Sequence, residues 1–217
     1  MRTEGTEGTE QSRGGLGSEA GGDSGVGGAT GHGEGGLRGE AGRERPAPGA
    51  PRVRIDAWSA GDLGLLRAAN AAELMTHLGG PETEEQILKR HERYVALSAD
   101  RTDKGRMFRV VLLPEEIPVG TIGFWEQTWD GEQVYETGWT VLAAHQGRGI
   151  AAAAVAAVVE RARAERTHRS LHAFPSVDNP ASNALCRRAG FSLLGERDFE
   201  YPPGHPRRVN NWRLRLT

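Results

Sequence analysis

Two glycines one residue apart, Gly147 and Gly149, stand directly before an alanine-rich run in the segment "HQGRGIAAAAVAAVV". Backbone N–H groups at the start of a helix have no partner within the helix, and with the helix dipole they attract anions, phosphate above all. Small side chains would let a bulky anion reach the N–H groups of Gly147, Arg148, Gly149, Ile150 and Ala151. Arg148 would add a positive charge at the same place. The alternative is a tight turn before a helix that packs through its alanines, since a glycine pair alone is weak evidence.

The letters around these glycines also test other nucleotide-binding motifs. No Gly-Lys-Ser/Thr follows, which excludes a Walker loop. The run "GRGIAA" satisfies Gly-x-Gly-x-x-Ala, the loose form of the dinucleotide fingerprint, which normally opens a doubly wound domain. Only about 65 residues follow the run, and the strands predicted before it form an antiparallel meander. A nicotinamide-dependent enzyme is therefore the less favoured hypothesis.

The elements that must position this turn follow from the hydrophobic periodicity of the chain after residue 51. Apolar runs predict strands over residues 52–58, 105–113, 119–129, 134–142, 170–177, 191–201 and 207–217. Helical spacing predicts helices over residues 63–75, 81–99, 150–166 and 181–189, the first of them capped by Asp62. Because the strands meander early and a crossover helix comes later, we expect an α+β fold with a mixed, mostly antiparallel sheet.

A second motif, "DNPASNALCRRAGF" at residues 178–191, follows the fifth predicted strand. It places Asn179 after a strand, Ser182 three residues later, and a Gly-Phe pair after a short helix. Together with residues 146–151, this pattern resembles the GCN5-related N-acetyltransferase (GNAT) superfamily in both spacing and strand order over residues 52–217. The segment "LGGPETEE" and Ser182 are similar to the branch that includes ribosomal-protein N-terminal acetyltransferases and their small-molecule relatives.

The resemblance implies a fold and a cofactor site. In the GNAT fold about seven strands splay apart between the fourth and fifth, about four helices flank the sheet, and acetyl-CoA binds in the V-shaped gap. Carried over to this chain, backbone groups of Val141 and Leu142 would pair with the pantetheine arm as an added strand would. The N–H groups from Gln146 to Ala151 would hold the pyrophosphate. Asn179 would form a hydrogen bond with the arm near the thioester.

Acetyl transfer needs a deprotonated amine and a leaving thiolate that is stabilised or protonated. The resemblance places Glu136 on the fourth strand, where relatives often carry a general base; the alternative is an outward carboxylate in a salt bridge. The tyrosine that many relatives use as the acid aligns with Cys186, so we expect Ser182 to take that role. The alternative for Ser182 is an ordinary serine of a first helical turn. We expect Cys186 to be a small packed residue, because direct transfer in a ternary complex needs no covalent intermediate.

Composition excludes several other classes of function. A net charge of −2 provides no basic field for nucleic acid or an anionic membrane. The single cysteine excludes an internal disulfide and a Cys-rich zinc site, and fits a reducing, cytoplasmic compartment. We find no apolar stretch of about 18 residues and no secretory signal. The histidines share no metal-ligand spacing, so we expect no metal. Trp125, Trp129 and Trp139 would form either an aromatic core or a wall of the acceptor pocket.

Residues 1–50 differ in composition from the rest of the chain. They hold 17 of the 31 glycines and no aromatic residue, so we expect a disordered tail before an N-acetyltransferase domain at residues 51–217. The predicted function is acetyl-CoA-dependent N-acetyl transfer to a primary amine of a small molecule or a protein N-terminus, by a monomer or homodimer. The alternative is a non-catalytic CoA-binding or regulatory domain of the same fold, favoured if neither Glu136 nor Ser182 faces the thioester. The letters do not identify the acceptor.

Overall fold

A single mixed sheet with helices on both faces makes up the part of the chain that the computed structural model describes, residues 51–100, 102, 104–200 and 206–216. The strands are β1 (Arg52–Ala57), β2 (Gly105–Leu113), β3 (Ile117–Trp129), β4 (Glu132–Val141), β5 (Ser170–Ala173), β6 (Ser192–Glu200) and β7 (Pro206–Arg215). The helices are α1 (Leu63–Ala69), α2 (Ala72–Met75), α3 (Glu84–Ala99), α4 (Ile150–Glu165) and α5 (Pro180–Arg188). The predicted tail, residues 1–50, lies outside the described residues.

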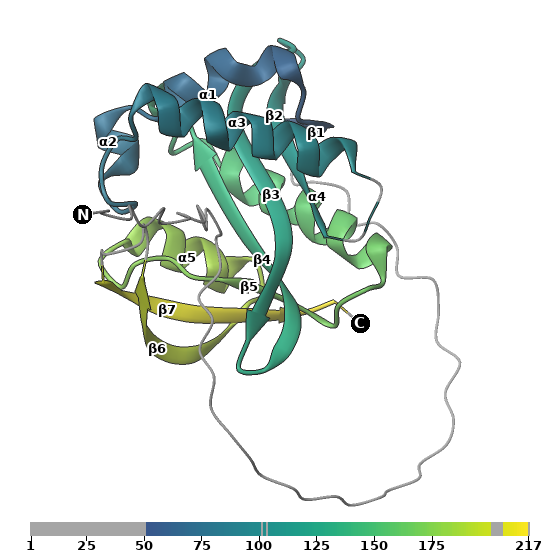
Figure 1. The fold of residues 1–217 in the computed structure, drawn as a ribbon, viewed down its shortest axis with the longest axis vertical. Helices are drawn as coiled ribbons and strands as arrows, with labels where there is room; N and C mark the ends of the chain where they lie inside the picture. Colours follow the sequence, from purple (N-terminus) through teal and green to yellow (C-terminus); the bar gives the residue numbers. More distant parts are fainter. Residues whose placement is uncertain (1–50, 101, 103, 201–205, 217) are drawn as a thin grey trace, which may run out of the picture.

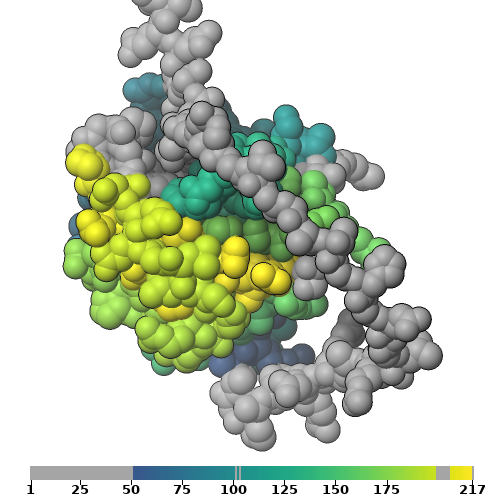
Figure 2. All heavy atoms as spheres, turned by 90° about the horizontal axis from the view of Figure 1, so that it is seen from below, coloured from purple at the N-terminus to yellow at the C-terminus, as the bar shows by residue number. Residues whose placement is uncertain are grey.

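The seven strands are arranged in the order β1-β2-β3-β4-β5-β7-β6, and β4–β5 is the parallel pair among the described strands. The predicted mixed, mostly antiparallel sheet is therefore confirmed. Helices α1 and α3 pack against β2 and β3 on one face, and α4 packs against β1, β3 and β4 on the other (Figure 1). Helix α5 lies beside α4, and the C-terminal strands form much of the underside in Figure 2.

Two apolar clusters correspond to the two helix layers. The larger lies between the sheet and α4, whose Ala154, Val155 and Val158 are almost fully buried at helical spacing. The smaller cluster lies under α1 and α3 and includes Met107 and Tyr94. The larger cluster includes Tyr135 and Val141 of β4, and the smaller reaches β3 through Trp125, because each strand presents alternate side chains to the two faces of the sheet.

The first predicted helix is broken, and the break shapes the loop that follows. Asn70 ends α1, and its side-chain amide forms two hydrogen bonds with the backbone of Glu82, as a neighbouring strand would. Asn70 Nδ2 donates to Glu82 O at 2.9 Å, and Glu82 N donates to Asn70 Oδ1 at 2.9 Å. Asparagine competes with the helix by bonding backbone groups in this way. Residues 63–75 therefore form two short helices instead of the single predicted one.

Two further details differ from the prediction. Asp62 makes no side-chain cap for α1; its carboxylate accepts from Ser59 N at 2.7 Å and pairs with Arg109 at 3.2 Å. Strand β5 ends at Ala173 instead of continuing to residue 177. Pro175, two residues later, has no N–H group with which to extend the ladder.

Candidate functional site

Strands β4 and β5 pair over a short stretch and then separate. Their register contains two residue pairs, Tyr135 with Leu171 and Glu136 with His172. Strand β4 continues to Val141, whereas β5 has ended at Ala173. The predicted splay between the fourth and fifth strands is therefore present, and Glu136 lies at the point where the gap opens.

The start of α4 offers a row of unpaired main-chain amides. Gly147 and Gly149 have φ values of 71° and 79°, a left-handed conformation that strains any residue with a Cβ. Within the described part of the chain, no main-chain or side-chain acceptor is found for the N–H groups of residues 147–152. Ala153 is the first to donate, to Gly149 O at 3.1 Å. The glycines therefore shape a turn and also leave donors that an anion can use.

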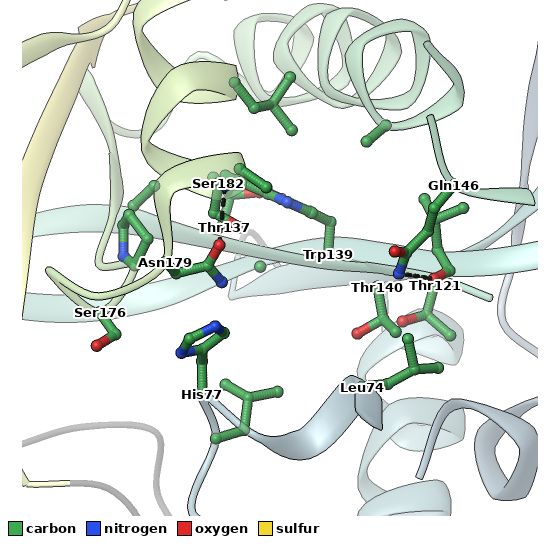
Figure 3. A pocket seen from close by; sticks show the side chains of 18 of the residues that line it. Leu74, His77, Thr121, Thr137, Trp139, Thr140, Gln146, Ser176, Asn179 and Ser182 are labelled. Atoms are coloured by element: carbon green, nitrogen blue, oxygen red, sulfur yellow. Dashed lines mark hydrogen bonds between the residues drawn. The ribbon is translucent and has the colours of Figure 1, made fainter. Parts of the chain in front are cut away.

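A cavity of about 800 Å³ joins the gap to this helix start. Its walls come from β4, the α4 turn, the segment after β5, α5 and, opposite them, α2 with the loop that follows it (Figure 3). Most of the predicted site residues line it: Glu136, Val141, Gln146, Gly147, Gly149, Ile150, Ala151, Asn179 and Ser182. The structure thus brings together residues from 136 to 182 that the sequence separates.

Three predicted cofactor contacts need correction or narrowing. Leu142 does not line the cavity, and both its backbone groups are used: its N–H donates to Val119 O at 2.9 Å and its carbonyl accepts from His145 N at 2.8 Å. We therefore assign no cofactor contact to Leu142. Gln146 N donates to Ala143 O at 3.2 Å, so the free amides begin at the next residue. Arg148 is exposed beside His145 and outside the lining, although its own N–H belongs to the free row.

Glu136 is a buried carboxyl group without an ion-pair partner among the described residues. Its residue is 7 % exposed, and Gln127 Nε2 donates to its Oε2 at 3.2 Å. Burial raises the pKa of Glu136 to about 7, while the polar Gln127 and Trp125 side chains oppose the rise. The alternative of an outward carboxylate in a salt bridge is wrong. A carboxyl that gains and loses a proton near neutral pH suits a general acid or base.

Glu136 belongs to a row of buried polar side chains that crosses the sheet. Gln127 on β3, Glu136 on β4, His172 on β5 and Asn211 on β7 are each less than 9 % exposed. His172 Nδ1 lies 2.9 Å from Asn211 Oδ1, and burial lowers the pKa of this histidine. Gln127 bonds with Glu136 and His172 bonds with Asn211, so these buried polar side chains provide one another with hydrogen-bond partners.

Asn179 and Ser182 are positioned by the first turn of α5. Asn179 Oδ1 accepts from Ser182 N at 3.0 Å, which caps the helix and leaves the amide nitrogen directed to the cavity (Figure 3). Asn183, which the motif analysis did not single out, fixes this loop. Its Nδ2 donates to Ser176 O and Asn179 O, both at 2.8 Å, and its Oδ1 accepts from Trp212 Nε1 at 2.8 Å. The position of Asn183 one helical turn after Asn179 was the sequence feature that could have indicated this contact.

The cysteine and the tryptophans fall into different environments. Cys186 is fully buried, and burial raises the pKa of its thiol to about 12, as expected of a packed residue. Trp125 and Trp139 line the cavity. Trp129 does not; its ring lies 4.5 Å from that of Phe174. The sequence did not decide whether the three tryptophans belong to the core or to the pocket. In the structure Trp125 and Trp139 line the pocket, and Trp129 does not.

For the wall opposite β4, no individual side chain was singled out from the sequence. It includes Leu74, His77, Tyr94 and Met107, which come from α2, the loop after it, α3 and β2. His77 points into the cavity toward Asn179, and Leu74 points into it near Thr121 and Thr140 (Figure 3). Leu74 and His77 are three residues apart, which was the one local sign that they share a face.

Residues 52–192 match the family model described as an acetyltransferase (GNAT) domain. The chain belongs to the GNAT acetyltransferase family. A search of curated protein sequences gave no significant match. The family assignment confirms the resemblance drawn from the two motifs, and it makes the doubly wound dinucleotide fold wrong. The "GRGIAA" run begins α4, the helix that connects β4 to β5, and these two strands form the one parallel pair of the described sheet.

Solved GNAT structures share the fold at low sequence identity. A spermidine N-acetyltransferase from Vibrio cholerae, in complex with CoA and spermine, aligns with a TM-score of 0.62 at 18% identity over 76% of this chain and 95% of that one. An acetyltransferase from Salmonella typhimurium that modifies the N-terminal serine of a 50S ribosomal subunit protein gives 0.62 at 22% over 76% and 95%. An aminoglycoside acetyltransferase in complex with coenzyme A gives 0.60 at 18% over 76% and 95%.

The described residues contain no group of three or more His, Cys, Asp or Glu side chains placed to hold a metal ion. No helix among them is long and apolar enough to cross a membrane.

Proposed function

We propose that this acetyltransferase moves the acetyl group of acetyl-CoA onto the primary amine of a small molecule or a protein N-terminus. The observation that carries the proposal is the shared cavity: the buried Glu136, which has no ion-pair partner among the described residues, lines the same space as the free amides at the start of α4. Structural neighbours that bind CoA and acetylate polyamines, aminoglycosides or a protein N-terminus support an amine acceptor without distinguishing among these classes.

Acetyl-CoA would lie along the gap between β4 and β5. The diphosphate would accept hydrogen bonds from the N–H groups of residues 147–151, where the α4 dipole favours negative charge. The pantetheine arm would follow β4 beside Val141, and the Asn179 amide would donate to it near the thioester. These contacts would place the acetyl carbonyl beside Glu136, where the strands separate.

The transfer itself would be a direct attack in a ternary complex. The amine nitrogen forms a bond to the carbonyl carbon of the thioester, and the carbon–sulfur bond breaks. Glu136 takes the proton that the amine loses, directly or through water. Ser182 donates its hydroxyl proton to the leaving thiolate and regains one from solvent. No enzyme-bound acetyl group is formed, and the buried Cys186 takes no part.

An acetyl-CoA consumption assay against a panel of primary amines tests the proposal. We expect CoA release that depends on both the amine and the enzyme, with an N-acetylated product detected by mass spectrometry. Tight acetyl-CoA binding without transfer to any amine would instead favour the non-catalytic CoA-binding domain.

The pH dependence of kcat/KM reports the protonation state of Glu136. Because its pKa is raised to about 7, the carboxyl is protonated below that pH and cannot accept the amine proton. We expect kcat/KM to rise about tenfold per pH unit up to about pH 7 and then to level off. An acceptor with a pKa near 10, as for a lysine amine, stays protonated over this range, so it binds as the ammonium ion, Glu136 removes its proton, and the titration of the free amine lies above this limb. A profile without a limb between pH 5 and 8 would contradict the role of Glu136.

A further inference from the structure

The acceptor end of the cavity lies on the sheet face covered by α1 and α3. Trp125 on β3 is directly opposite Glu136 on β4, and Met107 and Tyr94 pack on the same face as Trp125. Glu136 shares this face, because its carboxylate bonds to Gln127, two residues along β3 from Trp125. The group proposed to take the amine proton therefore has aromatic and apolar side chains on one side and its polar neighbours Gln127 and His172 on the other.

A glycine on β4 gives Trp125 its place beside the base. A Cβ on Gly138 would lie 2.9 Å from Cη2 of the Trp125 indole, so the ring lies closely over a position without a side chain. Gly138 and Trp125 both line the cavity, and Trp125 is only half-buried. A flat aromatic surface therefore borders the space next to Glu136, where the body of an acceptor would pack.

The charges lining the cavity do not suit a polycation. Among the described lining residues the carboxylates are Glu73 and Glu136, and the arginines are Arg188 and Arg207, which balance them. Once Glu136 serves as the base, Glu73 alone is left to pair with further ammonium groups, and it is exposed at the rim. A spermidine or aminoglycoside would bring several positive charges to a wall of rings and aliphatic side chains.

From this wall we infer that the acceptor is a monoamine whose single amino group is attached to an aromatic or aliphatic body. The inference rests on the proposed acetyl transfer and names its substrate class. The body would lie on Trp125 and against Leu74 and Tyr94, and the amine would reach Glu136. Apolar surroundings also favour the neutral, reactive form of the amine.

The test compares 2-phenylethylamine, ethylamine and spermidine as acceptors for the full-length protein. We expect kcat/KM for 2-phenylethylamine to exceed that for ethylamine, which lacks the ring, by at least about 100-fold, the range that apolar pockets provide. It should also exceed that for spermidine. If spermidine has the higher kcat/KM, the inference is overturned and the proposed transfer stands. If acetyl-CoA binds and none of these three acceptors is acetylated, the inference is overturned, and the wider panel of amines then decides the proposed transfer.

Two substitutions probe the wall itself. Trp125→Ala should reduce the preference for 2-phenylethylamine over ethylamine about 10-fold or more, with an unchanged acetyl-CoA dissociation constant, and Trp125→Phe should restore most of it. Leu74→Glu should raise kcat/KM for spermidine relative to 2-phenylethylamine. This variant tests the same wall if Trp125→Ala does not fold. Leu88→Ala, at an exposed position on α3 outside the lining, is the matched control. An unchanged ratio in folded Trp125→Ala would contradict the inference.

Discussion

Replacing Glu136 by glutamine is expected to lower kcat by about 10²- to 10⁴-fold, the usual contribution of a general base. The substitution keeps the size of the side chain and an oxygen that can still accept from Gln127 Nε2. It removes the group that would take the amine proton. Because Glu136 is not proposed to contact CoA, the dissociation constant of acetyl-CoA should not change. Steady-state kinetics and calorimetric titration measure the two quantities separately.

The stability of Glu136→Gln shows whether a loss of activity could come from misfolding. We expect its free energy of unfolding at pH 8 to be no lower than that of the parent. The raised pKa means that the native state holds a proton on Glu136 between about pH 4.5 and 7, where the unfolded chain has lost it. Stability from this group is therefore present below about pH 4.5 and is lost as the pH rises to about 7. The cost at pH 8 is about 3 kcal/mol, at 1.36 kcal/mol per pKa unit. Glu136→Gln avoids this cost, so its free energy of unfolding should equal or exceed that of the parent at pH 8.

Glu132→Gln provides the matched control. It makes the same chemical change on the same strand, at an exposed position outside the cavity lining. We expect the control to keep the parent kcat and the parent pH profile. Equal turnover in Glu136→Gln and Glu132→Gln would exclude Glu136 as the base.

Placing a carboxylate at the start of α4 is expected to abolish tight acetyl-CoA binding without harming the fold. Ala152 is the third helical residue, is exposed and lines the cavity. An acidic side chain in a first turn interacts favourably with the helix dipole, so Ala152→Asp should be at least as stable as the parent. Its charge would repel a diphosphate held by the neighbouring amides. We expect the dissociation constant of acetyl-CoA to rise by at least about 100-fold, as for close like charges near a protein surface.

Two controls separate charge from shape and from location. Ala152→Asn has nearly the same size without the charge and should weaken binding far less. Ala156→Asp puts the same charge one turn further along α4, at an exposed position outside the lining, and should bind acetyl-CoA like the parent. Raising the salt concentration should recover part of the loss in Ala152→Asp, because the repulsion is screened. Unchanged affinity in Ala152→Asp would place the diphosphate elsewhere.

The local parts of the site could be predicted from the sequence. The turn at Gly147 and Gly149 and the cap from Asn179 to Ser182 depend on residues within a few positions of one another. The succession of strands along the chain followed from the apolar runs, whereas the place of β7 between β5 and β6 in the sheet was not predicted. The features that were predicted are fixed by backbone conformation and helix-terminus chemistry, which nearby letters determine.

The remaining features depend on contacts between distant segments. Leu142 loses its predicted role because β3 supplies Val119 O as a partner for its amide. Glu136 is buried because β3 and β5 pair on either side of it, which its own strand does not reveal. The wall around Leu74 exists because Asn70 breaks the helix to bond with Glu82, twelve residues away. In each case tertiary pairing overrides the local pattern.

A crystal structure with bound coenzyme A measures the central claim most directly. The account predicts diphosphate oxygens within hydrogen-bonding distance, roughly 2.7–3.2 Å, of the N–H groups of residues 147–151, with the sulfur between β4 and β5 near Glu136. Density for the diphosphate away from the start of α4, or a sulfur outside the gap, would contradict it.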